Sequence, residues 1–409
     1  MLIKIPPNVN TAILALQQAG YEAYAVGGAV RDSLMGREAH DWDVATSAPA
    51  KETERVFADR RVIETGIQHG TVTVLFDKEP LEITTFRVDG NYTDNRHPDS
   101  VTFAKTVEAD LSRRDFTVNA MAYNERDGLV DSFGGRADIE AGIIRCVGEP
   151  DKRFSEDALR IIRGLRFAAV LGFTIEPRTA ESILKNRALL NNVAVERITA
   201  ELSRLLCGEN AGTVLLNFAP VFEVILPEFA PLFRDLNGNA LSVFGKSVPV
   251  FEHRLAALAA EMRLNGETCL ALTKRLRLSN KSSERVCRLL QDSFTDFCSL
   301  TLAEQKHLLA RRSEADFHDS VAFQQAVQGP EKAAAAAEKA DAIYRSGCCL
   351  SLASLKVNGK DLQTLCGAEG KTVGLVLNTL LEEVLSETLP NEKKVLIERA
   401  KTLLNRCIS

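Results

Sequence analysis

The sequence predicts an α+β protein, with a mixed sheet and helices in the first third and helices alone in the remainder. Glycines and strand-like patterns alternate as far as about residue 148, whereas from residue 149 onward apolar residues recur at intervals of three and four. The length of 409 residues is enough for roughly two to four domains of about 100 to 200 residues each. The chain is therefore expected to join a sheet domain to a longer helical part.

The elements of the first third are short and are separated by glycines. A strand that runs into a glycine pair is followed by a helix, and extended structure then resumes. β-branched and aromatic residues mark further strands. The predicted elements are strands at residues 24–26, 41–45, 71–76 and 81–86, and a helix over 29–35.

Helices are predicted for most of the chain after residue 149. Apolar residues follow one helical face over residues 158–169. Pro330 precedes an alanine run, and proline fits the first turn of a helix. Further breaks are predicted at residues 219–220, 226–227 and 237–239, and the last helical segment spans 347–409.

Hydropathy and cysteine usage predict the compartment. No apolar run reaches the roughly 18 residues that cross a bilayer, and the first residues lack the apolar core of a signal peptide. The nine cysteines include no Cys-x-x-Cys pair, which indicates reduced, mostly buried thiols rather than a zinc site or a disulfide framework. These features predict a soluble, cytoplasmic protein.

The charge distribution leaves room for a nucleic-acid partner. The net charge of -5 and the pI near 5.8 argue against a surface that is basic throughout. However, residues 151–204 hold ten lysines and arginines against seven acids, a local balance of +3. A basic stripe is therefore expected in this segment, because phosphate binding depends on local charge.

The pair Asp41 and Asp43 is the first candidate site. Residues two apart on a strand project from the same face, so both carboxylates are expected to point to one place. Two adjacent carboxylates repel each other, and a divalent cation relieves that repulsion. Oxygen ligands suit Mg²⁺, which also binds substrate phosphates. The alternative for an isolated Asp-x-Asp is a solvated turn.

Residues 27–32, Gly-Gly-Ala-Val-Arg-Asp, are a candidate phosphate site. Gly27 and Gly28 allow backbone amides to approach an anion closely, and Arg31 adds a fixed positive charge. A glycine turn before a helix can also be purely structural. Combined with the two carboxylates, this segment predicts a bound triphosphate and its metal.

Two further segments supply nucleotide-binding candidates. Arg114, Asp115 and Asn119 offer donors and acceptors that suit a ribose and phosphate oxygens, although a salt-bridge cluster is the alternative. Asp157 and Arg160, three apart on an expected helix, are either a surface ion pair or a protein template. As a template, they would pair with the base edges of cytosine and adenine and reject uracil and guanine.

These motifs resemble, in order and spacing, the class II tRNA nucleotidyltransferases, or CCA-adding enzymes, of bacterial type. The likeness covers residues 27–32, 41–43, 113–115, 131–135 and 156–160, and more weakly 357–362 and 391–392. It implies a head of the DNA polymerase β-like nucleotidyltransferase superfamily followed by an all-α neck, body and tail. The implied bounds are 1–148 for the catalytic head, 149–205 for the neck with base recognition, 206–345 for the body and 346–409 for a tail that binds tRNA.

The resemblance also implies cofactors, partners and further site residues. It implies Mg²⁺ as the cofactor, CTP and ATP as nucleotides, and the tRNA acceptor arm and 3′ end as the partner, with the oligomeric state open between monomer and homodimer. Residues 89–98 are similar to the family's flexible loop, which adds Asp94 and Arg96 to the candidates. Glu156 and Arg163 join the base-recognition set.

The expected function is template-independent addition of CCA to the 3′ end of tRNA, with release of pyrophosphate. An enzyme that adds only CC or only A remains an alternative, although CC-adding relatives typically lack part of the loop. A poly(A) polymerase is a second alternative, but residues 61–70 lack the arginine-rich strand of those relatives. A non-enzymatic RNA-binding relative would be expected to have lost Asp41 and Asp43.

Two weaker candidates complete the set. Glu82 lies on a predicted strand and could be a third metal carboxylate, although a solvent-facing residue is the simpler interpretation. His318 and Asp319 could belong to a phosphohydrolase-type metal site, but no supporting series of histidines and aspartates accompanies them. They are therefore expected to be ordinary surface residues.

Overall fold

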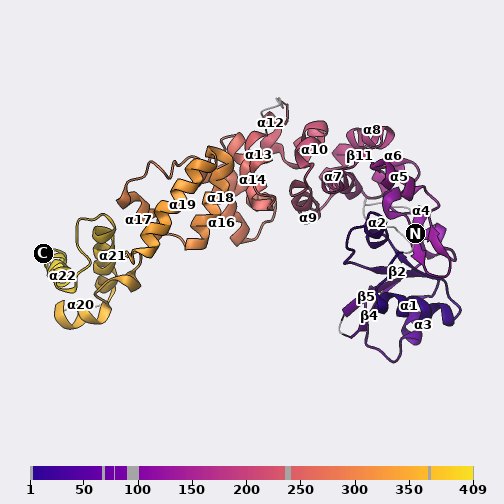
Figure 1. Ribbon diagram of the computed structural model, residues 1–409, viewed down its shortest axis with the longest axis horizontal. Helices are drawn as coiled ribbons and strands as arrows, with labels where there is room; N and C mark the ends of the chain where they lie inside the picture. The colour runs from indigo at the N-terminus through magenta and orange to yellow at the C-terminus, as the bar shows by residue number, and fades with distance from the viewer. Residues whose placement is uncertain are drawn as a thin grey trace. The chain divides into compact units, whose positions relative to one another are not determined.

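The computed structural model describes residues 3–66, 70–77, 79–89, 101–234, 241–366 and 370–408. The chain forms two compact units (Figure 1). Unit 1 comprises Met1–Gly238 and Arg275–Arg277, and unit 2 comprises Asn239–Lys274 and Leu278–Ser409. The division falls inside the segment predicted as the body, and the four-part division with bounds at 148, 205 and 345 remains a prediction.

Unit 1 is built on a mixed seven-stranded sheet in the order β3-β4-β5-β2-β1-β8-β9. Strand β2 pairs in parallel with β5, and the other neighbouring strands pair antiparallel. Strands predicted at 24–26, 71–76 and 81–86 are confirmed within two residues at either end. The strands are β1 (Ala23–Val26), β2 (Asp43–Thr46), β3 (Val62–Gly66), β4 (Thr71–Phe76), β5 (Glu79–Thr85), β8 (Ala122–Asn124) and β9 (Gly128–Val130).

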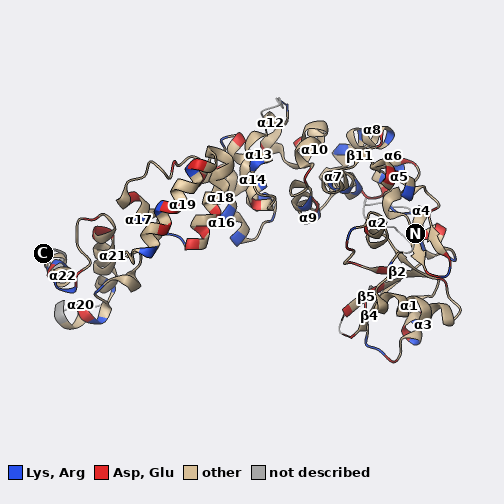
Figure 2. Cartoon of the chain, in the orientation of Figure 1, with Lys and Arg blue, Asp and Glu red and all other residues tan. Residues whose placement is uncertain are grey.

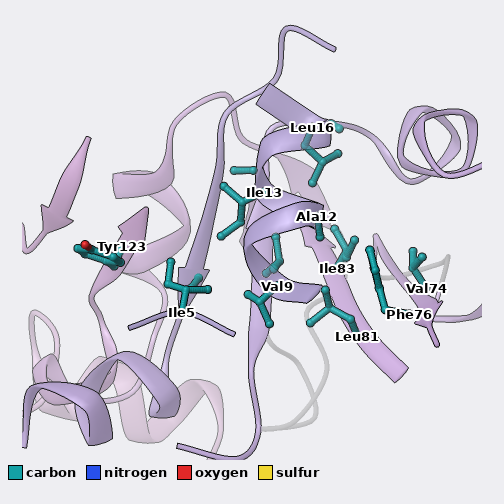
Figure 3. Close-up of a cluster of buried hydrophobic side chains, with 14 of the residues drawn as sticks. Ile5, Val9, Ala12, Ile13, Leu16, Val74, Phe76, Leu81, Ile83 and Tyr123 are labelled. Atoms are coloured by element: carbon teal, nitrogen blue, oxygen red, sulfur yellow. The ribbon is translucent and has the colours of Figure 1, made fainter. Parts of the chain in front are cut away.

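Each face of this sheet carries its own hydrophobic core. On one face, helix α1 (Pro7–Gln18) packs Ile13 and Leu16 against strand residues such as Ile83 (Figure 3). On the other face, helix α4 (Val107–Ser112) contributes to a second cluster. Strand β2 alternates between them, since Val44 belongs to the first core and Ala45 to the second. Polar residues on the second face are thereby directed to the side of α4.

Short elements connect the sheet to a helical layer in unit 1. The head elements are α2 (Gly28–Leu34), α3 (Ala50–Val56), β6 (Arg87–Asp89), β7 (Val101–Phe103), η2 (Thr117–Asn119), α5 (Gly135–Ala141) and β10 (Ile143–Ile144). They are followed by α6 (Pro150–Glu156), α7 (Leu159–Leu171), β11 (Thr174–Ile175), α8 (Pro177–Asn186), η3 (Arg187–Asn192), α9 (Val195–Leu206), α10 (Ala211–Asn217), α11 (Ala219–Ile225), η4 (Pro227–Phe229) and α12 (Ala230–Arg234). The predicted neck is therefore not wholly helical, because β11 pairs in parallel with β10. Two residues are too short for a periodic signal in the sequence.

Unit 2 is helical throughout its described part, as predicted. It contains α13 (Ser242–Lys246), α14 (Phe251–Glu261), α15 (Gly266–Arg275), α16 (Asn280–Ser293), α17 (Leu302–Ala310), α18 (Glu314–Gln328), α19 (Pro330–Arg345), η5 (Leu352–Ser354), α20 (Gly359–Cys366), α21 (Lys371–Leu385) and α22 (Lys393–Ile408). The predicted helix start at Pro330 is confirmed. Basic and acidic residues are interspersed along these helices (Figure 2). Among the helices described, none is long and apolar enough to cross a membrane.

Candidate active site

The carboxylates of Asp41 and Asp43 lie at the start of strand β2. The strand begins at Asp43, two residues later than the sequence predicted, and Asp41 precedes it. Trp42, between them, packs against the core on the α1 side and donates a hydrogen bond from Nε1 to the Ala39 carbonyl oxygen (3.1 Å). The indole is thus anchored, whereas the residues on either side of it, Asp41 and Asp43, are exposed.

Glu82 joins this pair through the register of the sheet. Strands β2 and β5 run in parallel with Asp43 directly opposite Glu82. Leu81 and Ile83 enter the core on the α1 side, so Glu82 projects from the same face as Asp43. The sequence interpretation favoured a solvent-facing Glu82; the side chain is indeed exposed, but it is also the neighbour of Asp43.

The carboxylates of Asp41, Asp43 and Glu82 lie close together and repel one another. Asp43 is an exposed residue, yet it lines an open cavity, and the groups around its carboxylate keep part of the water away from it. Burial and the charge of Glu82 raise the pKa of Asp43 to about 6, with a smaller contribution from Asp41, against the opposing charge of Arg114. A divalent cation would relieve this repulsion, so the oxygen donors present fit a hard metal ion.

The glycine pair faces arginines across the cavity. Gly27 has a φ of +77°, and a Cβ at this position would lie 3.0 Å from Nη1 of Arg114. Only glycine combines this backbone conformation with such a close approach. Arg31 is buried and donates from Nη1 to Oδ1 of Asn119 (2.6 Å) and from Nε to Oδ1 of Asp32 (2.9 Å).

Asp110 holds the adjacent arginines in place. It accepts hydrogen bonds from Arg113 Nη2 (2.7 Å) and Arg114 Nη2 (3.3 Å) and is 1% exposed. Burial by itself would raise the pKa of Asp110, but the two arginine charges outweigh it and lower that pKa. The sequence interpretation missed Asp110, because an acid three or four residues before an arginine is an ordinary helical pattern.

Asp115 is bound by an arginine from helix α7. Arg163 donates from Nε to Oδ2 of Asp115 (2.8 Å), and the amide of Phe116 donates to Oδ1 (2.8 Å). Burial acts to raise the pKa of Asp115, but Arg163 overcomes it and the pKa falls to about 2. Arg163 also lies 3.5 Å from Glu201 of α9, whose other oxygen lies 2.8 Å from Nε of Arg166.

The base-recognition candidates do not form the helix pair that the sequence predicted. Helix α6 ends at Glu156, Asp157 has extended backbone (φ −138°, ψ 104°), and α7 begins at Leu159. The apolar periodicity continues through this break, which concealed it in the sequence. Asp157 therefore lies at the junction between two helices rather than on one helix with Arg160.

Asp157 and Arg160 have different ion-pair partners. Arg197 of α9 donates from Nη2 to Oδ2 of Asp157 (2.9 Å), and the amide of Leu159 donates to Oδ1 (3.0 Å). Arg160 donates from Nη1 to Oε2 of Glu156 (2.8 Å) and from Nη2 to the Arg113 carbonyl oxygen (2.9 Å). Both side chains are thus fixed in position before any ligand binds.

A single cavity of about 470 Å³ unites most of these residues. It contains six arginines and three aspartates, a surplus of positive charge that suits a polyanion. Phe167 lies among these arginines, and the Arg166 guanidinium is 4.1 Å from its ring centroid. The lining residues are Gly27, Gly28, Arg31, Asp43, Arg113, Arg114, Asp115, Asn119, Asp157, Arg160, Arg163, Arg166 and Phe167.

The remaining candidates have different outcomes. Asp94 and Arg96 lie outside the described residues. Arg166, Arg197 and Glu201 belong to the site region but were missed by the sequence interpretation. The sequence interpretation counted all three only in the charge balance of residues 151–204, and the four-residue spacing of Arg197 and Glu201 is equally typical of a surface helix.

Three family descriptions match successive parts of the chain. Residues 23–145 match the "Poly A polymerase head domain", and residues 172–233 match the "Probable RNA and SrmB-binding site of polymerase A". Residues 251–400 match "tRNA nucleotidyltransferase domain 2 putative". The matched order runs from the sheet domain into the helices of unit 2.

Individual relatives extend over nearly the whole chain. The CCA-adding enzyme of Ligilactobacillus salivarius is 35% identical over 98% of both chains, and that of Limosilactobacillus fermentum is 36% identical over 95% of both. The crystal structure of the Bacillus stearothermophilus CCA-adding enzyme in complex with CTP superposes with a TM-score of 0.82 at 32% identity. It covers 98% of this chain and 100% of that chain.

Proposed function

The chain belongs to the CCA-adding enzymes, and on this premise we propose that it adds C, C and A in turn to the 3′ end of tRNA from CTP and ATP. In each step the terminal 3′-hydroxyl attacks the α-phosphate of the nucleotide, and pyrophosphate leaves. The observation that carries the proposal is the cavity, which brings a sheet carboxylate, several arginines and the residues Asp157 and Arg160 into one space.

Asp41 and Asp43 would hold the catalytic metal ion, with Glu82 as a third carboxylate. Support comes from the strand register that places Glu82 beside Asp43 and from the raised pKa of Asp43, which results from burial and from the charge of Glu82. Mg²⁺ is the ion we propose, because the donors are all oxygens and the substrate brings phosphates. When bound, this ion would lower the charge barrier to attack at the α-phosphate.

The glycine pair and its arginines would bind the triphosphate. Gly27 permits the chain to approach closely, and Arg114 lies directly opposite. Arg31 carries a fixed charge that its bond to Asn119 holds in position. Arginine offers a planar set of donors to phosphate oxygens. Asn119 and Asp115 would then contact the ribose hydroxyls.

Arg160 and Asp157 would read the base edge. Three of the five guanidinium donors of Arg160 are used in bonds to Glu156 and to two backbone oxygens, which leaves two for ring acceptors. Asp157 would accept from the exocyclic amine of cytosine or adenine. Uracil and guanine would meet Asp157 with a carbonyl oxygen, which leaves two acceptors facing each other.

Arg197 is a positioning residue in this scheme. It reaches Asp157 from helix α9, forty positions later in the sequence. Its two-point contact fixes the carboxylate orientation on which discrimination depends. Glu201, one turn further along α9, supports Arg163 and Arg166 in the same way.

The decisive experiment uses a tRNA that lacks its last three nucleotides and, in parallel, a tRNA that ends in CC. The enzyme is incubated with Mg²⁺ and with CTP, ATP, UTP or GTP, singly and combined, and product lengths are read on a gel. Addition of two residues with CTP and of three with CTP plus ATP is expected. A product that stops after CC with both nucleotides, a product only on tRNA ending in CC, or a long adenosine tail would each contradict the proposal and identify an alternative.

Substitutions test whether the carboxylate of Asp41 takes part in nucleotide addition. Asp41→Asn should abolish addition, whereas Asp59→Asn should not, because Asp59 is an exposed carboxylate of the same sheet domain that, unlike Asp41, does not belong to the Asp-x-Asp pair beside Glu82. Retention of normal turnover by Asp41→Asn would remove this carboxylate from the metal site. Far-UV circular dichroism of both variants checks that the fold is kept.

A further inference from the structure

Helices α18 and α19 carry a cluster of ligand-type side chains that the catalytic scheme does not use. Glu314 and His318 lie one turn apart on α18, and Asp341 lies on α19. One ligand atom from each residue falls within 4.8 Å of the other two. The cluster belongs to unit 2, whereas the carboxylates of strand β2 belong to unit 1.

The helical hairpin itself brings these residues together. Gly329, with a φ of +98°, ends α18, and Pro330 begins α19. His318 and Asp341 are separated from this turn by similar numbers of residues. In an antiparallel hairpin they therefore lie opposite each other on the two helices. Phe317 and Ala340, their immediate neighbours, are buried in the shared core of the two helices.

The side chains of His318 and Asp319 lie in two different environments. Asp319 turns toward His253, Arg285 and Arg288, whose nitrogens lie 2.6 to 2.8 Å from its carboxylate. His318 turns the other way, and its Nε2 lies 3.2 Å from Oδ1 of Asp341. The sequence predicted ordinary surface residues here, and the phosphohydrolase-type pair that it disfavoured does not form. Asp319 departs from that prediction because it is held by three partners, and the imidazole of His318 is left to a different set of acids.

The charges of this cluster are not balanced by lysine or arginine. The other two acids of α18, Asp316 and Asp319, each pair with arginines of α16. Within the described part of the chain, no lysine or arginine forms an ion pair with Glu314, and the ion pair of Asp341 is with His318. Arg345 donates to the backbone oxygen of Asp341 rather than to its carboxylate.

The pKa of Tyr344 is also affected by the negative charge of this cluster. The pKa of Tyr344 is raised by burial and by the charge of Glu314, with a smaller contribution from Asp341, against the opposing charge of Arg312. The Tyr344 hydroxyl is shielded from solvent and, among the described residues, has no hydrogen-bond partner. The cluster is thus an accessible spot of negative potential that contains an imidazole.

We infer that Glu314, His318 and Asp341 form a binding site for a transition-metal ion of the Zn²⁺ type, which joins α18 to α19. One imidazole nitrogen and two carboxylates are a ligand set that zinc accepts with water in the fourth position. Ligand atoms about 2.0 to 2.1 Å from a tetrahedral ion are roughly 3.3 Å apart. The 3.2 Å between His318 Nε2 and Asp341 Oδ1 matches that spacing. Mg²⁺ prefers six oxygens, so the site would select against the catalytic ion.

The chain contains a matched control histidine. His307 of α17 lies 2.9 Å from Glu382 of α21, so it forms the same kind of half-exposed histidine–carboxylate pair. It lacks the second carboxylate, and it belongs to no three-residue ligand group among the described residues. A simple ion pair and a metal site therefore predict different results for His307 and His318.

The test is a titration of the full chain with Zn²⁺ by calorimetry, after treatment with EDTA and with Mg²⁺ in excess. Wild type should bind one Zn²⁺ more tightly than His318→Ala by at least about tenfold, and Asp341→Asn should show the same loss. His307→Ala should bind as wild type does. An Asp41→Asn, Asp43→Asn double variant should also keep this site, which separates it from the proposed catalytic ion.

Cobalt identifies the ligands. Co²⁺ bound at this site should give visible absorption without a thiolate-to-metal charge-transfer band, because no cysteine takes part. Equal titrations of wild type and His318→Ala, or equal losses in His307→Ala and His318→Ala, would overturn the inference. A thiolate band that persists in His318→Ala would assign the metal to cysteines instead. Retained circular dichroism in each variant rules out misfolding as the cause.

Discussion

Replacement of Arg197 by methionine should weaken nucleotide selection while the chemistry continues. Methionine keeps the apolar stem but removes both guanidinium contacts to Asp157, at 2.9 Å and 3.5 Å. One contact then remains on Asp157, the 3.0 Å bond from the Leu159 amide. The carboxylate can then rotate away from the position proposed for the exocyclic amine of the base, but it is not lost.

The expected size follows from the hydrogen bond that Asp157 is proposed to make to the base. A hydrogen bond to a charged group contributes about 1.5 to 3 kcal/mol, so complete loss in Asp157→Ala should reduce discrimination by roughly ten- to a hundred-fold. Arg197→Met leaves the carboxylate in place, and its loss should be smaller, about three- to tenfold. Asp157→Ala should also destabilise the start of α7 by about 1 kcal/mol, since it removes the bond to Leu159.

The assay is the ratio of kcat/KM for CTP to that for UTP in the first addition to tRNA lacking CCA. Arg204→Met serves as the matched control, because Arg204 is an exposed arginine of the same helix outside the cavity lining. If Arg197→Met selects CTP as well as Arg204→Met does, while Asp157→Ala does not, then Arg197 has no positioning role. If all three variants select equally well, the protein-template mechanism itself is wrong.

Four further predictions concern catalysis, the phosphate site, acid stability and RNA binding. Asp43→Asn should slow C and A addition equally, by roughly a hundredfold or more, as measured by single-turnover kinetics. Gly27→Ala should raise KM for CTP, because a side chain strains a φ of +77° by about 1 kcal/mol and presses on Arg114. Asp115 is ionised in the fold with a pKa near 2, below its ordinary 3.8. Its contribution, on the order of 2 kcal/mol, is therefore present above pH 4 and lost toward pH 2; urea unfolding of wild type and Asp115→Asn should converge at acid pH. The Kd for tRNA should rise at least about tenfold between 50 and 200 mM salt, and a salt-independent Kd would contradict phosphate binding.

Local sequence patterns were sufficient for the elements whose signals lie within a few residues. The strand at residues 71–76 alternates buried and partly buried side chains along its whole length, and the sequence predicts its bounds without error. Gly27, Arg31 and Asp43 could be assigned to one site because they occur close together in the sequence. All three line the same cavity.

Long-range pairing explains what the sequence could not predict. Glu82 meets Asp43 only because β5 pairs in parallel with β2 after an intervening β3–β4 hairpin. Arg197 reaches Asp157 from a separate helix. The break at Asp157 was concealed because the apolar spacing on both sides of it fits one continuous helix. Nothing in composition or periodicity encodes these three relations.

The cations that line the cavity, among the residues described, are all arginines. Even Arg166, whose pKa burial lowers to about 10, stays protonated at neutral pH. Lysine acetylation removes positive charge from a basic surface. It has no target in this lining, because the reaction requires an amine. The positive charge of this cavity is therefore insensitive to lysine acetylation. Acetylation of this chain would have to act on lysines outside the cavity lining.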